Sequence, residues 1–181
     1  YQNGWGVLRD EKQAMAWYIR AAEQGHIKAQ FNLGMMCLNG RGIEKDPVKA
    51  REWFEKAAAQ NGPRSQYMLG RLYLDGEGVK KDEKAAFSWF KKSADNDYAE
   101  AIYQVGLMLE NGTGTGRDEK EALLFYRKAA DAGDAEAKYG MGEMDEMGKG
   151  TEKSTEKAME WYKRAAQQGH HKSQDKLISH G

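Results

Sequence analysis

Aromatic and small apolar residues recur along this chain at an interval of 36 residues. Residues 46–60 (DPVKAREWFEKAAAQ) contain one such set, spaced i, i+3, i+4, i+7 and i+8: Ala50, Trp53, Phe54, Ala57 and Ala58. That spacing places all five on one face of an amphipathic helix. Residues 28–38 carry a second helical stripe, made of Ala29, Leu33, Met36 and Cys37. The pattern predicts two helices per repeat, called A and B below, and therefore an all-α repeat protein.

Other ladders keep the same period without an insertion or deletion. They are Trp17, Trp53, Trp89, Phe125 and Trp161; Gly34, Gly70, Gly106 and Gly142; and the Gly-x-Gly steps that begin at Gly4, Gly40, Gly76, Gly112 and Gly148. The tryptophans share a face with the alanines, so we expect them in the core. A glycine inside helix A lacks a Cβ, which should let helix A approach the alanine pair of helix B.

The Gly-x-Gly steps should form tight connections between helices A and B, with Trp5 at the tip of the first one. The run Gly112–Gly116 is therefore interpreted as a turn, because no Gly-Lys-Ser/Thr follows it as a phosphate loop requires. Helix B should start at the N-caps Asp10, Asp46, Asp82, Asp118 and Ser154. It should end at Gly25, Gly62, Gly133 and Gly169.

One unit resembles a known family in the positions Leu69-Gly70, Tyr73, Gly76-Glu77-Gly78-Val79, Asp82, Lys84-Ala85-Ala86, Trp89 and Ala94. The family is the Sel-one-like repeat (SLR), which is similar to the tetratricopeptide repeat. The resemblance implies a right-handed α-α superhelix, a solenoid of 36-residue helix-turn-helix repeats that scaffolds protein complexes. On this phasing, residues 1–181 are a single array: a half repeat (1–28), four full repeats (29–64, 65–100, 101–136, 137–172), and a capping or fraying helix at 173–181.

Two departures from the pattern stand out. Asp145 occupies a core position where the family has Tyr or Leu, and the segment 149–155 lacks the usual apolar plug and Asp cap. The repeat phase also places Tyr1 inside a unit, so we expect the natural N-terminus to lie further upstream. A periplasmic or envelope location is favoured by the family resemblance alone.

The charge balance removes several classes of partner. Lys plus Arg and Asp plus Glu each number 28, so no net field draws the chain to nucleic acid. No apolar run reaches the roughly 18 residues of a membrane span, so membrane insertion is not expected. Cys37 is the only cysteine and should be a buried, inert thiol. His26, His170, His171 and His180 are interpreted as solvated linker residues, and no catalytic, cofactor or metal signature appears.

Helix A carries a second stripe that lies away from its core face. The candidate partner-binding residues on this stripe, here called the A-stripe, are Lys28, Phe31, Met35, Leu38, Arg64, Tyr67, Arg71, Leu74, Glu100, Tyr103, Leu107, Tyr139 and Glu143. In solenoids of paired helices this side usually lines the concave groove. Its charge runs from basic to acidic along the chain, ending at Glu110, Glu136 and Glu146. The alternative is that the aromatic residues only pack between neighbouring A helices.

These observations favour a non-enzymatic scaffold or adaptor that binds a polypeptide partner in the groove. A narrower alternative is a bacterial immunity protein that neutralises one secreted effector. A third is the repeat part of an enzyme or regulator whose other domain is not in this sequence. A partner protein or peptide is expected in the first two cases, and no cofactor in any of them.

Overall fold

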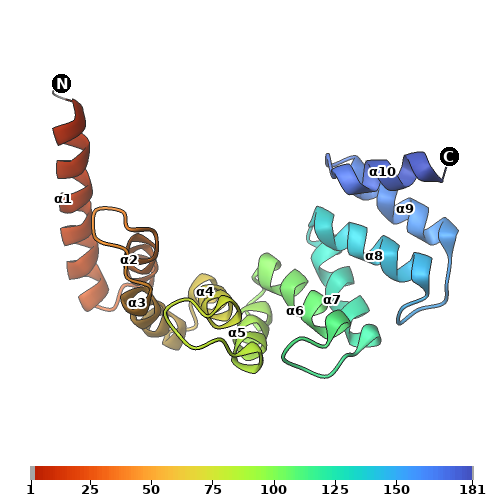
Figure 1. Ribbon diagram of the computed structural model, residues 1–181, viewed down its shortest axis with the longest axis horizontal. Helices are drawn as coiled ribbons and strands as arrows, with labels where there is room; N and C mark the ends of the chain where they lie inside the picture. Colours follow the sequence, from red (N-terminus) through yellow and green to blue (C-terminus); the bar gives the residue numbers. More distant parts are fainter. Residues whose placement is uncertain (1–2, 181) are drawn as a thin grey trace. The chain divides into compact units, whose positions relative to one another are not determined.

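The computed structural model describes the backbone of residues 3–180 and the side chains of residues 13–180, and it is helical throughout (Figure 1). No strand occurs in that range, so the all-α class is confirmed. Two compact units are present, residues 1–96 and 97–181. The first contains α1 (Asn3–Glu23), α2 (Ile27–Asn39), α3 (Pro47–Ala59), α4 (Pro63–Asp75) and α5 (Glu83–Asp95). The second contains α6 (Ala99–Asn111), α7 (Glu119–Asp131), α8 (Ala135–Met147), α9 (Thr155–Ala166) and α10 (His171–Ser179).

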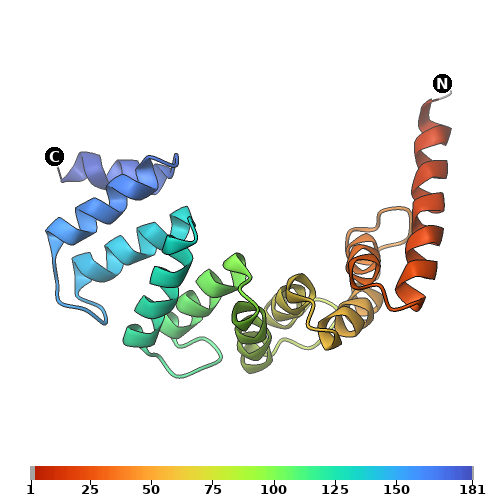
Figure 2. The same ribbon diagram turned by 180° about the vertical axis from the view of Figure 1, so that it is seen from behind.

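Within each unit every helix packs against the next one in the chain, as Figures 1 and 2 show. The even-numbered helices α2, α4, α6 and α8 are the predicted A helices, and α3, α5, α7 and α9 are the predicted B helices. The predicted segments 28–38 and 46–60 match α2 and α3 to within one or two residues at each end. This agreement arises because helix length and spacing follow directly from the repeated apolar pattern.

The B helices begin at side-chain caps, as predicted. Asp46, Asp82 and Asp118 accept a hydrogen bond from the backbone N–H three residues later, at N···O distances of 3.0, 3.0 and 2.9 Å. Ser154 does the same for Lys157 at 3.3 Å. Each cap satisfies one of the N–H groups that a helix leaves free in its first turn.

The Gly-x-Gly steps form the predicted tight turns after each A helix. Gly40, Gly76, Gly112 and Gly148 are left-handed C-caps, and the glycine two residues later also has a positive φ in each copy. The second glycine also brings repeats together, because a Cβ on Gly78 would lie 2.5 Å from the carbonyl of Pro47 in α3. The Gly112–Gly116 run is thus a helix connection, as predicted.

The residue that ends helix B differs from the prediction in one repeat. Gly25, Gly133 and Gly169 do adopt a positive φ, but in the second repeat this conformation belongs to Asn61 (φ 60°) and not to Gly62. Gly62 instead has a φ of −69° and is the N-cap of α4. Asn is the non-glycine residue that tolerates the left-handed region best, together with Asp, which occupies the equivalent position 97.

The glycine inside each A helix makes room for an aromatic ring. A Cβ on Gly70 would lie 2.7 Å from the Phe90 ring, and Gly34, Gly106 and Gly142 face Phe54, Tyr126 and Tyr162 in the same way. The close approach of helices A and B is therefore confirmed. Its partner is the ring of helix B and not the alanine pair that we expected.

The tryptophan ladder is not the core, which corrects the prediction from sequence. Phe54, Phe90, Tyr126 and Tyr162 are at most 1% exposed, whereas their tryptophan or phenylalanine neighbours are only half-buried and Trp17 is 70% exposed. Trp53 and Trp89 each carry a lysine ammonium over the ring, at 4.0 and 4.3 Å from the centroid. They cover the edge of the core with one face and meet solvent with the other.

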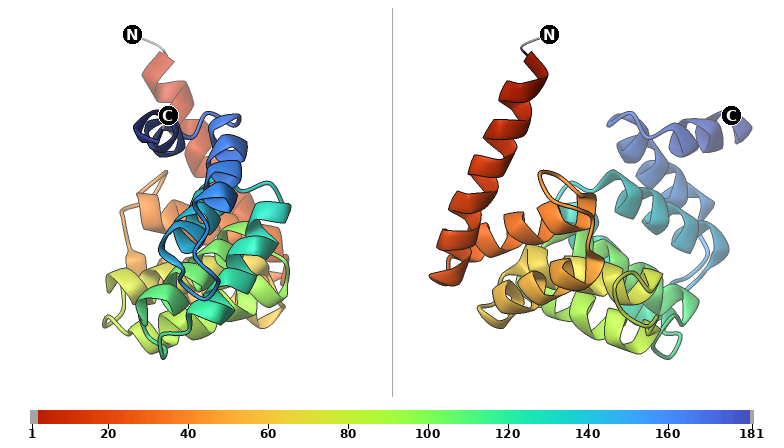
Figure 3. Two further views of the ribbon diagram at one scale, coloured as in Figure 1. Left: turned by 90° about the vertical axis from the view of Figure 1, so that its right-hand side faces the viewer. Right: turned by 60° about the vertical axis from the view of Figure 1, so that its left-hand side comes forward.

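The first helix also departs from the prediction. α1 runs without a break through Gly4, Gly6 and Asp10, where a Gly-x-Gly turn and an N-cap were expected (Figure 3). In later repeats this turn is closed by bonds such as Gly76 N–H to the Leu72 carbonyl. Each such bond ties the turn to the end of the preceding A helix, and no turn of this kind interrupts α1. The environment expected for the Trp5 side chain lies outside the described residues.

Candidate functional site

The A-stripe is a solvent-accessible surface in both units. In the N-terminal unit α2 contributes Lys28, Phe31, Met35 and Leu38, and α4 contributes Arg64, Tyr67, Arg71 and Leu74; each is half-buried or exposed. The core of these helices is formed by other residues, including Leu33, Cys37, Leu69 and Leu72. The stripe is therefore a separate helix face, as the spacing indicated.

The aromatic residues of the stripe pack mainly on helix B of their own repeat. The Phe31 and Phe54 ring centroids are 5.8 Å apart, and those of Tyr67 and Phe90 are 5.4 Å apart. Such tilted pairs suit the quadrupoles of the two rings. This contact contributes to the burial of the rings, which remain partly solvent-accessible.

A hollow of about 430 Å³ lies between the first turns of α2 and α4. Ile27, Lys28, Phe31, Asn32, Gly62, Pro63, Arg64 and Ser65 line it. Three of these residues belong to the A-stripe: Lys28, Phe31 and Arg64. The tertiary structure thus brings together side chains that are 36 residues apart in the sequence.

The hollow is electropositive. Lys28 and Arg64 are exposed, and neither forms an ion pair among the described residues. The Arg64 guanidinium lies over the Phe31 ring, 4.4 Å from its centroid. Both helices also start without a side-chain cap hydrogen bond, so their N-terminal dipoles add to the positive potential. Arg71, in contrast, pairs with Asp75 at 3.7 Å.

The A-stripe of the C-terminal unit is acidic and more polar. Tyr103 packs on Tyr126 and Tyr139 on Tyr162, with centroids 5.7 and 5.6 Å apart. Glu100 is exposed and Leu107 is half-buried. Burial, followed by the nearby Glu136 carboxylate, raises the pKa of Tyr103 to about 12. Glu143 accepts a hydrogen bond from the Tyr139 hydroxyl at 2.9 Å.

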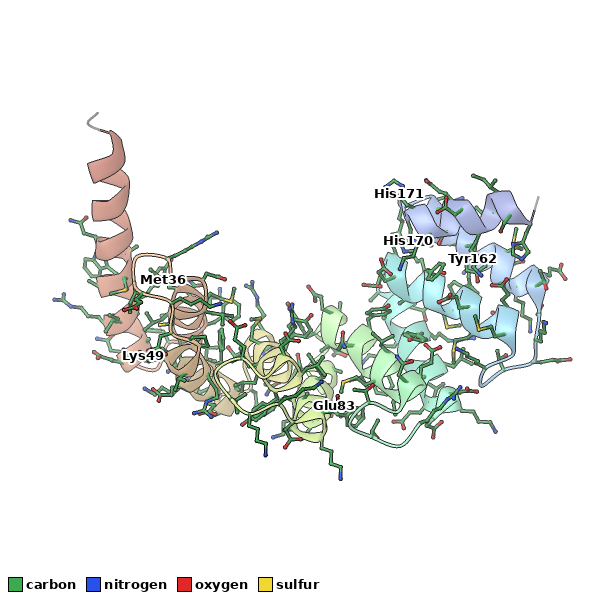
Figure 4. All side chains as sticks on the ribbon, in the orientation of Figure 1. Met36, Lys49, Glu83, Tyr162, His170 and His171 are labelled. Atoms are coloured by element: carbon green, nitrogen blue, oxygen red, sulfur yellow. The ribbon has the colours of Figure 1, made fainter. Side chains whose placement is uncertain are left out.

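Two of the acidic residues are already neutralised inside the protein. Glu110 accepts from the Tyr126 hydroxyl and from Lys149 Nζ, both at 2.7 Å. Glu146 accepts hydrogen bonds from the Tyr162 hydroxyl and from Lys176 Nζ, both at 2.6 Å. Figure 4 shows the position of Tyr162. The hydrogen bond from Lys176 is the main cause that lowers the pKa of Glu146. We therefore correct the expectation that these two carboxylates are free to attract a basic partner.

A Ser–His–Glu group in the C-terminal unit was missed from sequence. His170 is labelled in Figure 4. Its Nδ1 lies 2.8 Å from Ser173 Oγ, and its Nε2 lies 3.1 Å from a carboxylate oxygen of Glu136. Ser173 is fully buried, and its backbone N–H donates to His170, which caps α10. The group is a helix cap and not a nucleophile, and His170 is not the solvated linker residue that we predicted. A histidine three residues before a serine, as at His170 and Ser173, is a sequence signal for this cap.

The other candidate groups give no further site. Cys37 is 1% exposed, and burial is the main cause that raises the pKa of its thiol, in keeping with the inert role predicted. No cluster of three or more His, Cys, Asp or Glu side chains suited to a metal ion occurs among residues 13–180. Within the described helices, none is long and apolar enough to span a bilayer.

Stacked helix pairs with an accessible aromatic stripe define an α-solenoid repeat protein. The sequence profile of the Sel1 repeat matches residues 1–26, 27–62, 63–98, 99–134 and 135–170, so the chain belongs to the Sel1 repeat family that the sequence resembled. Sel1 repeats are generally protein-interaction scaffolds.

Solved structures agree with this assignment. A protective antigen of uropathogenic Escherichia coli with an SLR fold is 31% identical over 92% of this chain, with a TM-score of 0.89. A Sel1 repeat protein from Oxalobacter formigenes is 34% identical over 92% of the chain, with a TM-score of 0.83. The chain spans only 36% and 66% of these two proteins. Cysteine-rich protein B of Helicobacter pylori is 26% identical over 72% of this chain and 94% of its own, with a TM-score of 0.58. No protein with curated annotation matches the sequence.

Proposed function

We propose that this protein is a non-enzymatic adaptor that holds a polypeptide partner against the A-stripe. The observation that carries the proposal is the stripe itself, a repeated row of half-buried aromatic side chains that is separate from the core. Tyr and Arg, which recur on this stripe, are enriched among the residues that dominate binding energy at interfaces. The contacts of these rings within the protein leave each side chain partly solvent-accessible, and this accessible part is what a partner would contact.

The charge of the A-stripe should give a bound polypeptide a preferred direction. The N-terminal unit presents Lys28 and Arg64, and the C-terminal unit presents Glu100 and Glu136. We expect the segment bound at the first unit to be acidic and the segment bound at the second to be basic. Charge matching of this kind sets register and association rate more than affinity.

The test starts with affinity capture of partners on the immobilised chain, followed by mass spectrometry and calorimetry on the purified partner. Tyr67→Ala and Tyr103→Ala should each weaken binding by about 1–3 kcal/mol, the range of interface hot spots. Lys91→Ala on the B helix α5 is the control and should bind normally. Because Tyr67 packs on Phe90, thermal unfolding must first show that each variant is folded at the assay temperature.

The proposal is wrong if the two tyrosine variants bind normally while changes on the B helices or the turns abolish binding. Capture of a single secreted toxin, whose activity the chain inhibits, would narrow the adaptor to an immunity protein. An intrinsic catalytic activity in the purified chain would contradict the non-enzymatic assignment.

A further inference from the structure

The hollow between α2 and α4 combines an apolar floor with positive charge at its rim. Phe31 and Pro63 line it, and Ile27 beside them is 37% exposed although it is a large apolar residue. A volume of about 430 Å³ lies within the range of sites that bind small ligands or side chains. The floor therefore fits an apolar side chain of a partner.

The position of Arg64 indicates what should lie beside that side chain. Its guanidinium carbon lies over the Phe31 ring, 4.4 Å from the ring centroid, and this contact favours the observed position of the charged group. A guanidinium over an aromatic ring still offers N–H donors whose fork geometry matches the two oxygens of a carboxylate. Lys28 adds a second unpaired cation at the same hollow.

The polar groups of the wall are suited to a peptide. The half-buried Asn32 side chain makes no hydrogen bond among the described residues and can both donate to and accept from a main chain. Ser65, only 1% exposed, also lines the hollow, and its hydroxyl has no hydrogen-bond partner. Packing alone does not require the Ser65 hydroxyl, because the copies of Ser65 at positions 29, 101 and 137 are buried alanines.

The cation pair is a property of this one hollow and not of the repeat. The positions equivalent to Lys28 and Arg64 in the C-terminal unit are Glu100, Glu136 and Lys172, so no two successive copies there are both basic. Glu136 faces His170 there, and the nearby aromatic residue is a tyrosine. A structural requirement common to every repeat would have kept one charge at this position.

We propose that this hollow binds a polypeptide segment in which an Asp or Glu side chain lies next to a large apolar side chain. The apolar group would contact Phe31, Ile27 and Pro63, and the carboxylate would bind Arg64 and Lys28. This inference rests on the proposed adaptor function and specifies which segment of the partner the N-terminal unit recognises.

The experiment selects peptides from a phage-displayed library of random sequences on the immobilised full chain, then measures synthetic fluorescent peptides by anisotropy. We expect the selected peptides to carry Asp or Glu beside Leu, Ile, Phe or Met. Arg64→Glu should weaken their binding by about tenfold or more, as should replacement of the peptide's acid by its amide. Lys84→Glu, which reverses an exposed charge on α5 away from the hollow, should leave binding unchanged. Vesicles containing phosphatidylglycerol form a separate arm and should not bind.

The outcomes separate this inference from the adaptor function. Peptides that lack an acid, or that bind Arg64→Glu as well as the unaltered chain, would overturn the inference. If those same peptides still lose affinity with Tyr67→Ala or Tyr103→Ala, the adaptor function stands. Recovery of no binding peptide would count against both, and binding to the anionic vesicles alone would assign the hollow to a lipid surface.

Discussion

The pair formed by Tyr126 and Glu110 permits a quantitative test of how the repeats are held together. The equivalent pair in the N-terminal unit is apolar, with Phe54 in the place of the tyrosine and Leu38 in the place of the glutamate. Leu38 packs against the core cluster that contains Phe54. Tyr126→Phe combined with Glu110→Leu would therefore convert the polar pair into the apolar pair that the fold already uses.

The losses of unfolding free energy in the two single variants should add up to more than the loss in the double variant. Tyr126→Phe removes a 2.7 Å hydrogen bond to a carboxylate, which corresponds to about 1–2 kcal/mol of unfolding free energy. Glu110→Leu leaves a tyrosine hydroxyl without its acceptor in a side chain that is 1% exposed, which costs about 1–3 kcal/mol. The double variant has neither an orphaned hydroxyl nor an orphaned carboxylate. The Lys149 ammonium loses its Glu110 partner in both variants that lack Glu110, so this loss cancels in the cycle. We expect a coupling energy of about 1–2 kcal/mol between the two sites.

Urea denaturation followed by circular dichroism measures the four free energies of this cycle. Hydrogen exchange should place the losses of the single variants in α6 and α7 first, because each repeat is stabilised mainly by its neighbours. Tyr73→Phe is the matched control and should be nearly silent, since this half-buried hydroxyl forms no hydrogen bond with any side chain or backbone group of the described residues. Single effects that simply add in the double variant would refute the idea that the two residues act as one exchangeable pair.

Two further predictions follow from burial. Phe90→Ala should cost roughly 3–5 kcal/mol of unfolding free energy, because its ring is 0% exposed. Trp89→Ala should cost about half as much or less. Chemical denaturation of both variants measures the difference. Asp145→Asn should leave stability at pH 7 unchanged or slightly higher, because burial raises the pKa of this carboxyl above its ordinary 3.8. A raised folded-state pKa gives a stability contribution that is present below the unfolded pKa and is lost as the pH rises through the folded pKa. Thermal unfolding at pH 4 and pH 7 should therefore show a smaller loss on raising the pH in Asp145→Asn than in the unaltered chain, and a larger loss would contradict this reasoning.

Local physics made the helices, their caps and their turns predictable. Asp46, Asp82 and Asp118 cap helices because, where the chain enters a helix, a carboxylate reaches the free N–H three residues later. Gly40 and its copies end the A helices because the left-handed conformation there excludes most other residues. The prediction failed at Gly4 and Asp10, where the same residues form a continuous helix. Their turn depends on a preceding helix, so its sequence signal is not purely local.

The sequence by itself also determined that the A-stripe is a face apart from the core, since both stripes follow from helical spacing. Only the tertiary structure decided which of two neighbouring aromatics is buried. Trp53 and Phe54 are adjacent on α3 and both fit a broad apolar face, but the gap at Gly34 accepts the ring of Phe54. The same holds for charge. The sequence shows Glu110 as one more acid on a stripe, and only the packing of the next repeat brings Lys149 within 2.7 Å of it. The hollow at Phe31 likewise forms between residues one repeat apart, in α2 and α4. The distance between these two helices is set by tertiary packing and not by local sequence.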